Sequence, residues 1–174
     1  MSETVIAYWL LPLQPARSFF AHVIGELATR FDAPTFEPHL TLFIAPESSA
    51  SPSDVLANLP SAAIALNAGE IGHSHKFTKT LFMQFERSLA LQELADTIWR
   101  LSGASQRYVV HPHVSFLYKK LPAETLRELA RAIRLPFRQV QFQSISAMRC
   151  PSPTENTDDV WAWQLLAVQN STMR

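Results

Sequence analysis

One short phrase occurs twice in the chain, and it constrains the fold more than any other feature. The letters PHLTLF stand at residues 38–43, and PHVSFL stands 74 positions later at residues 112–117. Each copy is a proline, a histidine, an apolar residue, a hydroxyl residue and then further apolar residues. Side chains alternate between the two faces of a β-strand, so the histidine and the hydroxyl of each copy share one face. One such strand is therefore expected in each half of the chain.

The two phrases supply the candidate catalytic residues His39 and Thr41 from the first half and His113 and Ser115 from the second half. Histidine titrates near neutral pH, so one neutral and one protonated imidazole can serve as base and acid together. The two hydroxyls can donate hydrogen bonds to oxygens on which charge develops. If both strands face one cleft, this set suits acid–base chemistry on a phosphate ester.

Hydrophobic periodicity predicts the same order of elements in both halves. The expected elements of the first half are a strand at 4–13, a helix at 16–31, the His39 strand, a helix capped by Ser51 and a strand at 62–71. Those of the second half are a strand at 79–85, a helix capped by Ser88, the His113 strand, a helix from about Pro122 and a strand at 137–148. A last strand at 160–168 has no counterpart, and residues 151–157 are expected to form a loop.

This pattern predicts an α+β fold of two lobes, a duplicated β-α-β-α-β unit with pseudo-two-fold symmetry and two antiparallel sheets that face a central cleft. Residues 1–174 are expected to form a single bilobal domain. Its repeats would span approximately 1–75 and 76–150, and the final strand would lie within 158–168.

Composition and charge narrow the class of partner. Of the 174 residues 47% are hydrophobic, and the net charge is zero. Residues 78–174 carry twelve basic and eight acidic side chains, a net +4, with eight of the basic residues between 100 and 138. Those eight are interpreted as a solvated face, or alternatively as a modest basic rim for phosphates. The excess is too small for binding long duplex nucleic acid. No apolar run reaches the ~18 residues of a membrane span. The single cysteine, Cys150, favours a reducing compartment, and a cytoplasmic monomer is expected.

The two motifs, His39-Leu40-Thr41-Leu42 and His113-Val114-Ser115-Phe116, resemble those of the two-histidine (2H) phosphoesterase superfamily. Within it the chain is most similar to the cyclic phosphodiesterase branch and to the 2′-5′ RNA ligase-like enzymes. The resemblance implies a reaction without a metal or other cofactor. It also implies substrate contacts from Tyr118, which extends the second motif, and from Phe77, an aromatic residue that would meet a nucleobase. On a regular strand Tyr118 would point away from His113, so a strand end or bulge has to turn it.

The sequence and the resemblance together predict a phosphodiesterase that hydrolyses 2′,3′-cyclic or related cyclic phosphates of nucleotides or RNA 3′ ends to a phosphomonoester. Three alternatives remain open: joining of RNA ends through a 2′-5′ bond, a non-catalytic nucleotide- or RNA-binding module, and a metal-dependent hydrolase. The sequence does not decide which histidine is the base, because the two motifs are nearly equivalent.

Overall fold

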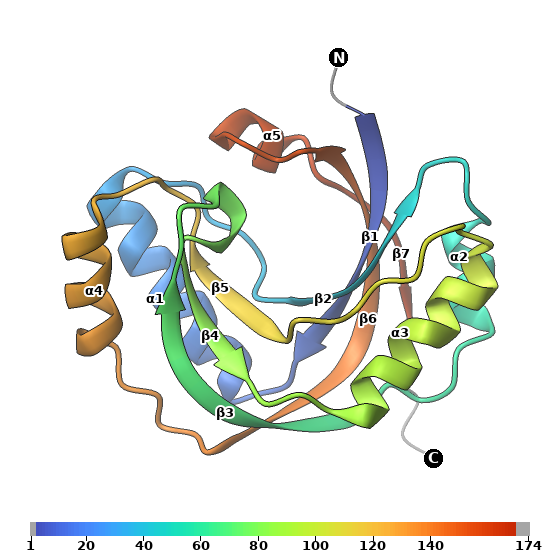
Figure 1. Cartoon of the computed structure of the whole chain (residues 1–174), viewed down its shortest axis with the longest axis horizontal. Helices are drawn as coiled ribbons and strands as arrows, with labels where there is room; N and C mark the ends of the chain where they lie inside the picture. Colours follow the sequence, from blue (N-terminus) through green and yellow to red (C-terminus); the bar gives the residue numbers. More distant parts are fainter. Residues whose placement is uncertain (1–2, 170–174) are drawn as a thin grey trace.

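The computed structural model describes residues 3–169, which form a curved antiparallel sheet flanked by helices (Figure 1). The elements follow the order β1 (Glu3–Pro12), α1 (Ala16–Phe31), β2 (Leu40–Pro46), α2 (Pro52–Ala57), β3 (Ile64–His73), the 3₁₀ turn η1 (Phe77–Lys79), β4 (Leu81–Phe85), α3 (Leu89–Ser102), β5 (His113–Leu117), α4 (Ala123–Ala132), β6 (Gln139–Ser152), α5 (Thr157–Trp161) and β7 (Gln164–Gln169). The α+β class and the repeated β-α-β-α-β order are those expected from the sequence.

The strands lie side by side in the order β2-β1-β6-β3-β4-β5, and β7 pairs with β6. All pairings are antiparallel. If β1, β2 and β3 are exchanged with β4, β5 and β6, the strand order reads the same from the opposite edge of the sheet. This symmetry is consistent with a duplication. The two expected antiparallel sheets are joined through β3, whose residues 64–67 pair with β6 and whose residues 68–73 pair with β4.

Two lobes can be defined by which helices cover which strands. In the first lobe, α3 packs on β2 and α2 packs on β7; in the second, α1 packs on β5 and α4 packs on β3. Figure 1 shows α2 and α3 on one side of the molecule and α1 and α4 on the other. The helices α1 and α3 therefore each cover a strand from the other half of the sequence. This exchange makes the two halves depend on each other for burial of their apolar surfaces.

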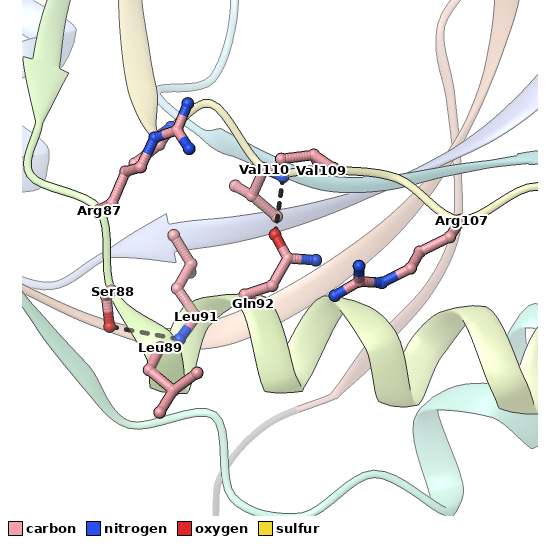
Figure 2. A pocket seen from close by; sticks show the side chains of 9 residues that line it. Arg87, Ser88, Leu89, Leu91, Gln92, Arg107, Val109 and Val110 are labelled. Carbon is pink, nitrogen blue, oxygen red and sulfur yellow. Dashed lines mark hydrogen bonds between the residues drawn. The ribbon is translucent and has the colours of Figure 1, made fainter.

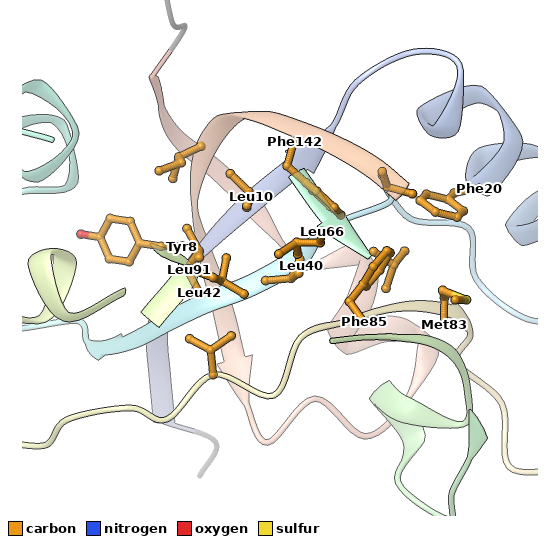
Figure 3. Packing of buried hydrophobic residues seen from close by; sticks show 14 of the residues in the cluster. Tyr8, Leu10, Phe20, Leu40, Leu42, Leu66, Met83, Phe85, Leu91 and Phe142 are labelled. Atoms are coloured by element: carbon orange, nitrogen blue, oxygen red, sulfur yellow. The ribbon is translucent and has the colours of Figure 1, made fainter. Parts of the chain in front are cut away.

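The hydrophobic core runs through both lobes without a break. Leu10 and Leu40 belong to the same buried cluster as Leu66, Phe85 and Phe142 (Figure 3). The core side of β1 is formed by its even-numbered residues, so the odd-numbered residues of β1 face the opposite side of the sheet. That opposite side holds a separate small apolar cluster of Ala7, Trp9, Leu11 and Cys150. Cys150 is buried and unpaired.

The first strand of the second half is shorter than expected. We predicted a strand from residue 79, but residues 77–79 form η1 and the strand begins at Leu81. The hydroxyl of Thr80 donates to the carbonyls of Lys76 and Phe77, at 3.1 and 2.9 Å. A threonine that hydrogen-bonds nearby carbonyls stabilises a turn in place of a strand ladder. The Ser88 cap of α3 is confirmed, since its hydroxyl accepts from the Leu91 amide.

The chain near its C-terminal end also differs from expectation. Residues 157–161 form α5, so the final strand begins at Gln164 and not at 158 or 160, and the preceding strand continues to Ser152. The side chain of Asn156 caps α5 by accepting from the Asp159 amide, and Asp158 and Asp159 lie in the first turn. Both features favour a helix start. Within residues 3–169, no helix is long and apolar enough to cross a membrane.

Candidate active site

The two histidine phrases meet at one cavity of about 370 Å³. Thr41, on β2, and His39, the residue before β2, line this cavity from one side. His113 and Ser115 line it from β5. Because β2 lies in the first lobe and β5 in the second, the cavity is formed by both halves of the chain. The four residues that the sequence singled out therefore share one site. The odd-numbered side of β1 and the end of β6 complete its walls.

Both imidazoles are held in the same way. Nδ1 of His39 lies 2.6 Å from the Glu37 carbonyl oxygen, and Nδ1 of His113 lies 2.6 Å from the His111 carbonyl oxygen. A carbonyl oxygen can only accept, so Nδ1 carries the proton in each ring. In the neutral imidazole this leaves the Nε2 lone pair as the one ring nitrogen open to a ligand. In both copies the accepting carbonyl belongs to the residue before the proline, so the repeated phrase specifies the hydrogen bond as well as the histidine.

The rings differ in what packs against them. The His39 ring stacks on Trp9, with 3.7 Å between ring centroids and an interplanar angle of 13°. The His113 ring meets Phe82 edge to face at 5.6 Å. Phe82 also carries the Lys79 ammonium 4.5 Å above its centroid. A Cβ on Gly72 would stand 2.7 Å from the Phe82 ring, so glycine at this position leaves room for that ring beside His113.

The environment of the cavity keeps both imidazoles neutral. Burial lowers the pKa of His39 to about 4, and the backbone hydrogen bond to Glu37 only partly opposes this effect. Burial likewise lowers the pKa of His113 to about 4, helped by the charges of Lys79 and His111. The charge of His113 also lowers the pKa of His39, which places the two rings within electrostatic reach of each other. Only His113 has a lysine among the charges that act on it.

The two hydroxyl residues are not equivalent, although the sequence suggested that they were. Ser115 is buried, and its hydroxyl donates to the Thr78 carbonyl at 2.8 Å and contacts the Tyr118 hydroxyl. Thr41 is half-buried, and its hydroxyl forms no hydrogen bond to another residue of the described part of the chain. A ligand entering the cavity would thus find the Thr41 hydroxyl ready to donate, whereas Ser115 would have to exchange its present acceptor.

Tyr118 lines the cavity and Phe77 does not. The strand β5 ends at Leu117, so Tyr118 is released from the alternation that would have turned it away from His113. Its ring stacks on Phe36 at 3.8 Å, and burial raises its pKa. The Phe77 ring lies beside the Tyr118 ring, with 5.9 Å between the two ring centroids. The residues on either side of Phe77, not Phe77 itself, reach the cavity.

Two lysines of this segment, Lys76 and Lys79, supply the positive charge of the cavity, and none of its described lining residues is a carboxylate. Partial burial and the neighbouring Lys76 lower the pKa of Lys79. The eight basic residues between 100 and 138 are the other candidates for a phosphate rim. None of those eight lines the cavity, so that alternative is wrong for this site. No sequence pattern marked Lys76 and Lys79, because only the folded η1 turn brings them to the histidines.

A second hollow of about 350 Å³ lies between the start of α3 and the segment that leads into β5 (Figure 2). In the segment before β5, Tyr108 lines the cavity of the two histidines while Arg107 and Val109 line this hollow. The positive charge of this hollow is partly neutralised, because one of its arginines, Arg107, forms an ion pair of 2.7 Å with Asp96. Leu89, at the start of α3, is 76% exposed at its edge. This hollow holds neither histidine of the repeated phrase.

Comparison with known proteins identifies a family. A family model described as cyclic phosphodiesterase-like protein matches residues 4–167. No match was found among curated proteins. In the part of the chain that the structure describes, no group of three or more His, Cys, Asp or Glu side chains could hold a metal ion.

Several solved structures share the fold. The apo form of LigT from E. coli is 14% identical, with a TM-score of 0.58 over 97% of both chains. LigT complexed with 3′-AMP is also 14% identical, with a TM-score of 0.54 over 95% of this chain and 96% of that one. A protein described as a phosphoesterase is 12% identical, with a TM-score of 0.53 over 97% of both chains. At such low identity these likenesses establish the fold alone.

Proposed function

The chain belongs to the cyclic phosphodiesterase-like family of the 2H phosphoesterase superfamily, and we propose that it hydrolyses 2′,3′-cyclic phosphates of nucleotides or RNA ends to phosphomonoesters without a metal. One observation carries this proposal. Two imidazoles with Nδ1 fixed by the same backbone bond line a single cavity that holds two lysines and no carboxylate among its described residues. An anionic ester fits that charge, and two Nε2 atoms fit a proton-in, proton-out reaction.

The charges around the rings favour His113 as the base and His39 as the acid. Lys79 and His111 disfavour a positive charge on His113, so His113 is the ring that stays neutral and can act as the base when one of the two rings is protonated. Nε2 of His113 takes a proton from water, and the water oxygen forms a bond to phosphorus. The bond from phosphorus to one ribose oxygen breaks, and Nε2–H of His39 gives that oxygen its proton. The second ribose oxygen keeps the phosphate, so the product is a phosphomonoester.

Stabilisation of the charge on the two non-bridging oxygens is assigned to Thr41, Lys76 and Lys79. The Thr41 hydroxyl has no acceptor among the described residues, and both ammonium groups lie in the cavity lining. Donors and cations fixed before the reaction act strongly in a site with little water. Ser115 is then chiefly a positioning residue, because its hydroxyl already bridges the η1 segment and Tyr118.

A substrate panel tests the proposed function. The protein is incubated with the four nucleoside 2′,3′-cyclic phosphates and with RNA fragments that end in a cyclic phosphate or a 5′-hydroxyl, each with and without EDTA. Phosphorus NMR should show the cyclic phosphate replaced by a monoester at the same rate with EDTA. A new 2′-5′ diester would favour end joining, and loss of activity with EDTA would favour a metal-dependent hydrolase. Binding without any conversion would favour a non-catalytic module.

The hydroxyl pair gives a prediction that separates catalysis from stability. Thr41→Ala should lower kcat about tenfold to several-hundred-fold, the usual effect of losing one preorganised donor, and Thr41→Ser should restore most of it. Ser115→Ala should change kcat less but lower the free energy of unfolding by about 1 kcal/mol, because the Thr78 carbonyl and the Tyr118 hydroxyl lose a partner. Steady-state kinetics and urea unfolding measure the two effects. Equal losses of kcat in both variants would contradict the difference in roles.

The lysines give a second prediction. Lys79→Gln should raise KM for an anionic substrate about threefold to tenfold and weaken the decrease of kcat/KM with salt, since one attractive charge near the phosphate is removed. Lys120→Gln is the matched control, because Lys120 is exposed and does not line the cavity. The measurement is kcat/KM between low and moderate ionic strength. An unchanged salt dependence in Lys79→Gln would place the phosphate away from η1.

A further inference from the structure

The side of β1 and β6 that forms the catalytic cavity continues beyond it into another hollow. Val5, Ala7 and Trp9 line the cavity, whereas Trp9 and Leu11 line a neighbouring hollow of about 420 Å³. Because these residues alternate along β1, they lie on one face of the sheet. The Trp9 indole is the wall that the two spaces share. The floor of this neighbouring hollow, here called the Trp9 hollow, lies over β1, β6 and β7.

The lining of the Trp9 hollow differs chemically from that of the cavity. Among the described residues that line it, the charged ones are Arg17 and Glu37, which form an ion pair of 2.5 Å, so these residues offer no unpaired charge to a phosphate. Leu11, Met148 and Leu165 give it apolar walls. The chemistry favours an uncharged, flat and partly apolar group with polar edges, which describes a nucleobase.

One polar group in this hollow is left without a partner. Ser146 is 6% exposed and lines the hollow, yet its hydroxyl forms no hydrogen bond to another residue between 3 and 169. Its neighbour Ser144 donates to the Gln169 carbonyl at 3.1 Å. Ser146 lines the hollow, so its hydroxyl can form a hydrogen bond with a polar group of a bound ligand.

The wall between the two spaces indicates how long that ligand is. Trp9 stacks on His39 and lines both the cavity and the Trp9 hollow, so it separates a phosphate at His39 from a group in the hollow. A nucleobase on the same ribose as that phosphate stays on the cavity side of Trp9, whereas the base of the preceding nucleotide can pass to the other side. We propose that the Trp9 hollow binds the nucleoside that precedes the cyclic-phosphate nucleotide. The preferred substrate would then be an RNA end of two or more nucleotides, an inference that rests on the proposed function.

The test compares substrates of one and two nucleotides. The values of kcat/KM are measured for adenosine 2′,3′-cyclic phosphate, for the dinucleotide ApA ending in a 2′,3′-cyclic phosphate, and for the same dinucleotide lacking its first base. We expect the dinucleotide to be preferred about tenfold or more over the other two, on the usual contribution of one bound base. Equal values for all three would overturn the proposal.

Two substitutions locate the effect. Leu165→Ala and Ser146→Ala should each reduce the dinucleotide preference about threefold to tenfold and leave kcat/KM for the mononucleotide unchanged. Leu165 is 60% exposed, so its truncation leaves the core intact, and the exposed Leu89 of the hollow in Figure 2 gives the control Leu89→Ala. A preference that survives both Leu165→Ala and Ser146→Ala, or a loss shared equally by the mononucleotide, would overturn the assignment of this hollow.

Binding keeps this test separate from that of the proposed function. The Kd values of 3′-AMP and of ApA 3′-phosphate are measured on the wild-type protein and on Leu165→Ala. Tighter binding of the dinucleotide that Leu165→Ala abolishes would support the subsite even if no cyclic phosphate is hydrolysed, in which case only the proposed function fails. Equal Kd values on the wild-type protein would overturn the subsite whatever the enzyme hydrolyses.

Discussion

Replacement of either His39 or His113 with alanine is expected to lower kcat for a cyclic phosphate by about 100-fold to 10,000-fold, the range in which positioned acids and bases contribute. Each change removes an Nε2 that no other described residue of the cavity lining replaces, because His39 and His113 are the two histidines among those residues. The double variant should be scarcely slower than either single one, since an acid and a base of one reaction act as a unit. Stopped kinetic assays at several enzyme concentrations measure all three.

A matched control and a second substrate sharpen this result. His22 is an exposed histidine on α1, paired only with Glu26, so His22→Ala should leave kcat unchanged. A phosphodiester with a p-nitrophenol leaving group needs no proton from an acid. It should therefore recover much of the rate lost in His39→Ala but not in His113→Ala. Recovery in His113→Ala alone would reverse the roles of the two histidines, and full activity of either single variant towards the cyclic phosphate would remove that residue from catalysis.

The second large effect concerns pH. Burial lowers the pKa of both His39 and His113 to about 4, so both rings of the free enzyme are neutral at pH 7. The reaction requires one of them to be protonated, and that fraction decreases about tenfold for each pH unit above about 5. The value of kcat/KM, which reports the free enzyme, should therefore fall as pH rises from about 5 to 8. Below about 4 both rings become protonated and the base is lost, so the profile has a maximum in the acidic range.

The profile of kcat should differ, because it reports the enzyme with substrate bound. A phosphodiester anion next to the imidazoles favours their charged form and raises the pKa of the acid. The falling limb of kcat should therefore lie at higher pH than that of kcat/KM. In Lys79→Gln the low-pH limb of kcat/KM, where the base His113 becomes protonated, should also move to higher pH, since a charge that lowers the His113 pKa is gone. A kcat/KM that is constant from about pH 5 to 8 would show that neither depressed pKa controls the reaction.

Features with a short-range signal could be predicted from the sequence. The helix at residues 16–31 was expected with its observed bounds, since proline precedes it and its apolar stripe has helical spacing. The histidine strands were recognised because each phrase is local, and the hydrogen bond to Nδ1 is local as well. The α5 helix was not predicted, although Asn156 as a capping residue and two aspartates in the first turn favour a helix start. We gave more weight to the alternation of Trp161 and Trp163, and Trp161 proved to be 71% exposed on that helix.

Features that depend on contacts between distant segments could not be predicted. The stack of Trp9 on His39 joins β1 to the residue before β2, and the charge of Lys79, in η1, acts on His113 in β5. The exchange of α1 and α3 between lobes has no signature in hydrophobic periodicity, which reports that a face is buried but not what covers it. The unequal surroundings of Thr41 and Ser115 arise in the same way, because the Thr78 carbonyl reaches Ser115 only through the η1 turn.

Histidine NMR tests the central claim most directly, namely that His39 and His113 bind the same phosphate through Nε2. Long-range proton–nitrogen spectra of the imidazoles are recorded at pH 7 while 3′-AMP is added, with His22 as the internal reference. We predict that the Nε2 signals of both His39 and His113 shift with one common Kd. Nδ1 of both rings should remain protonated, and the His22 signals should not change. A shift in only one of the two histidines, or two different Kd values, would contradict a shared phosphate site.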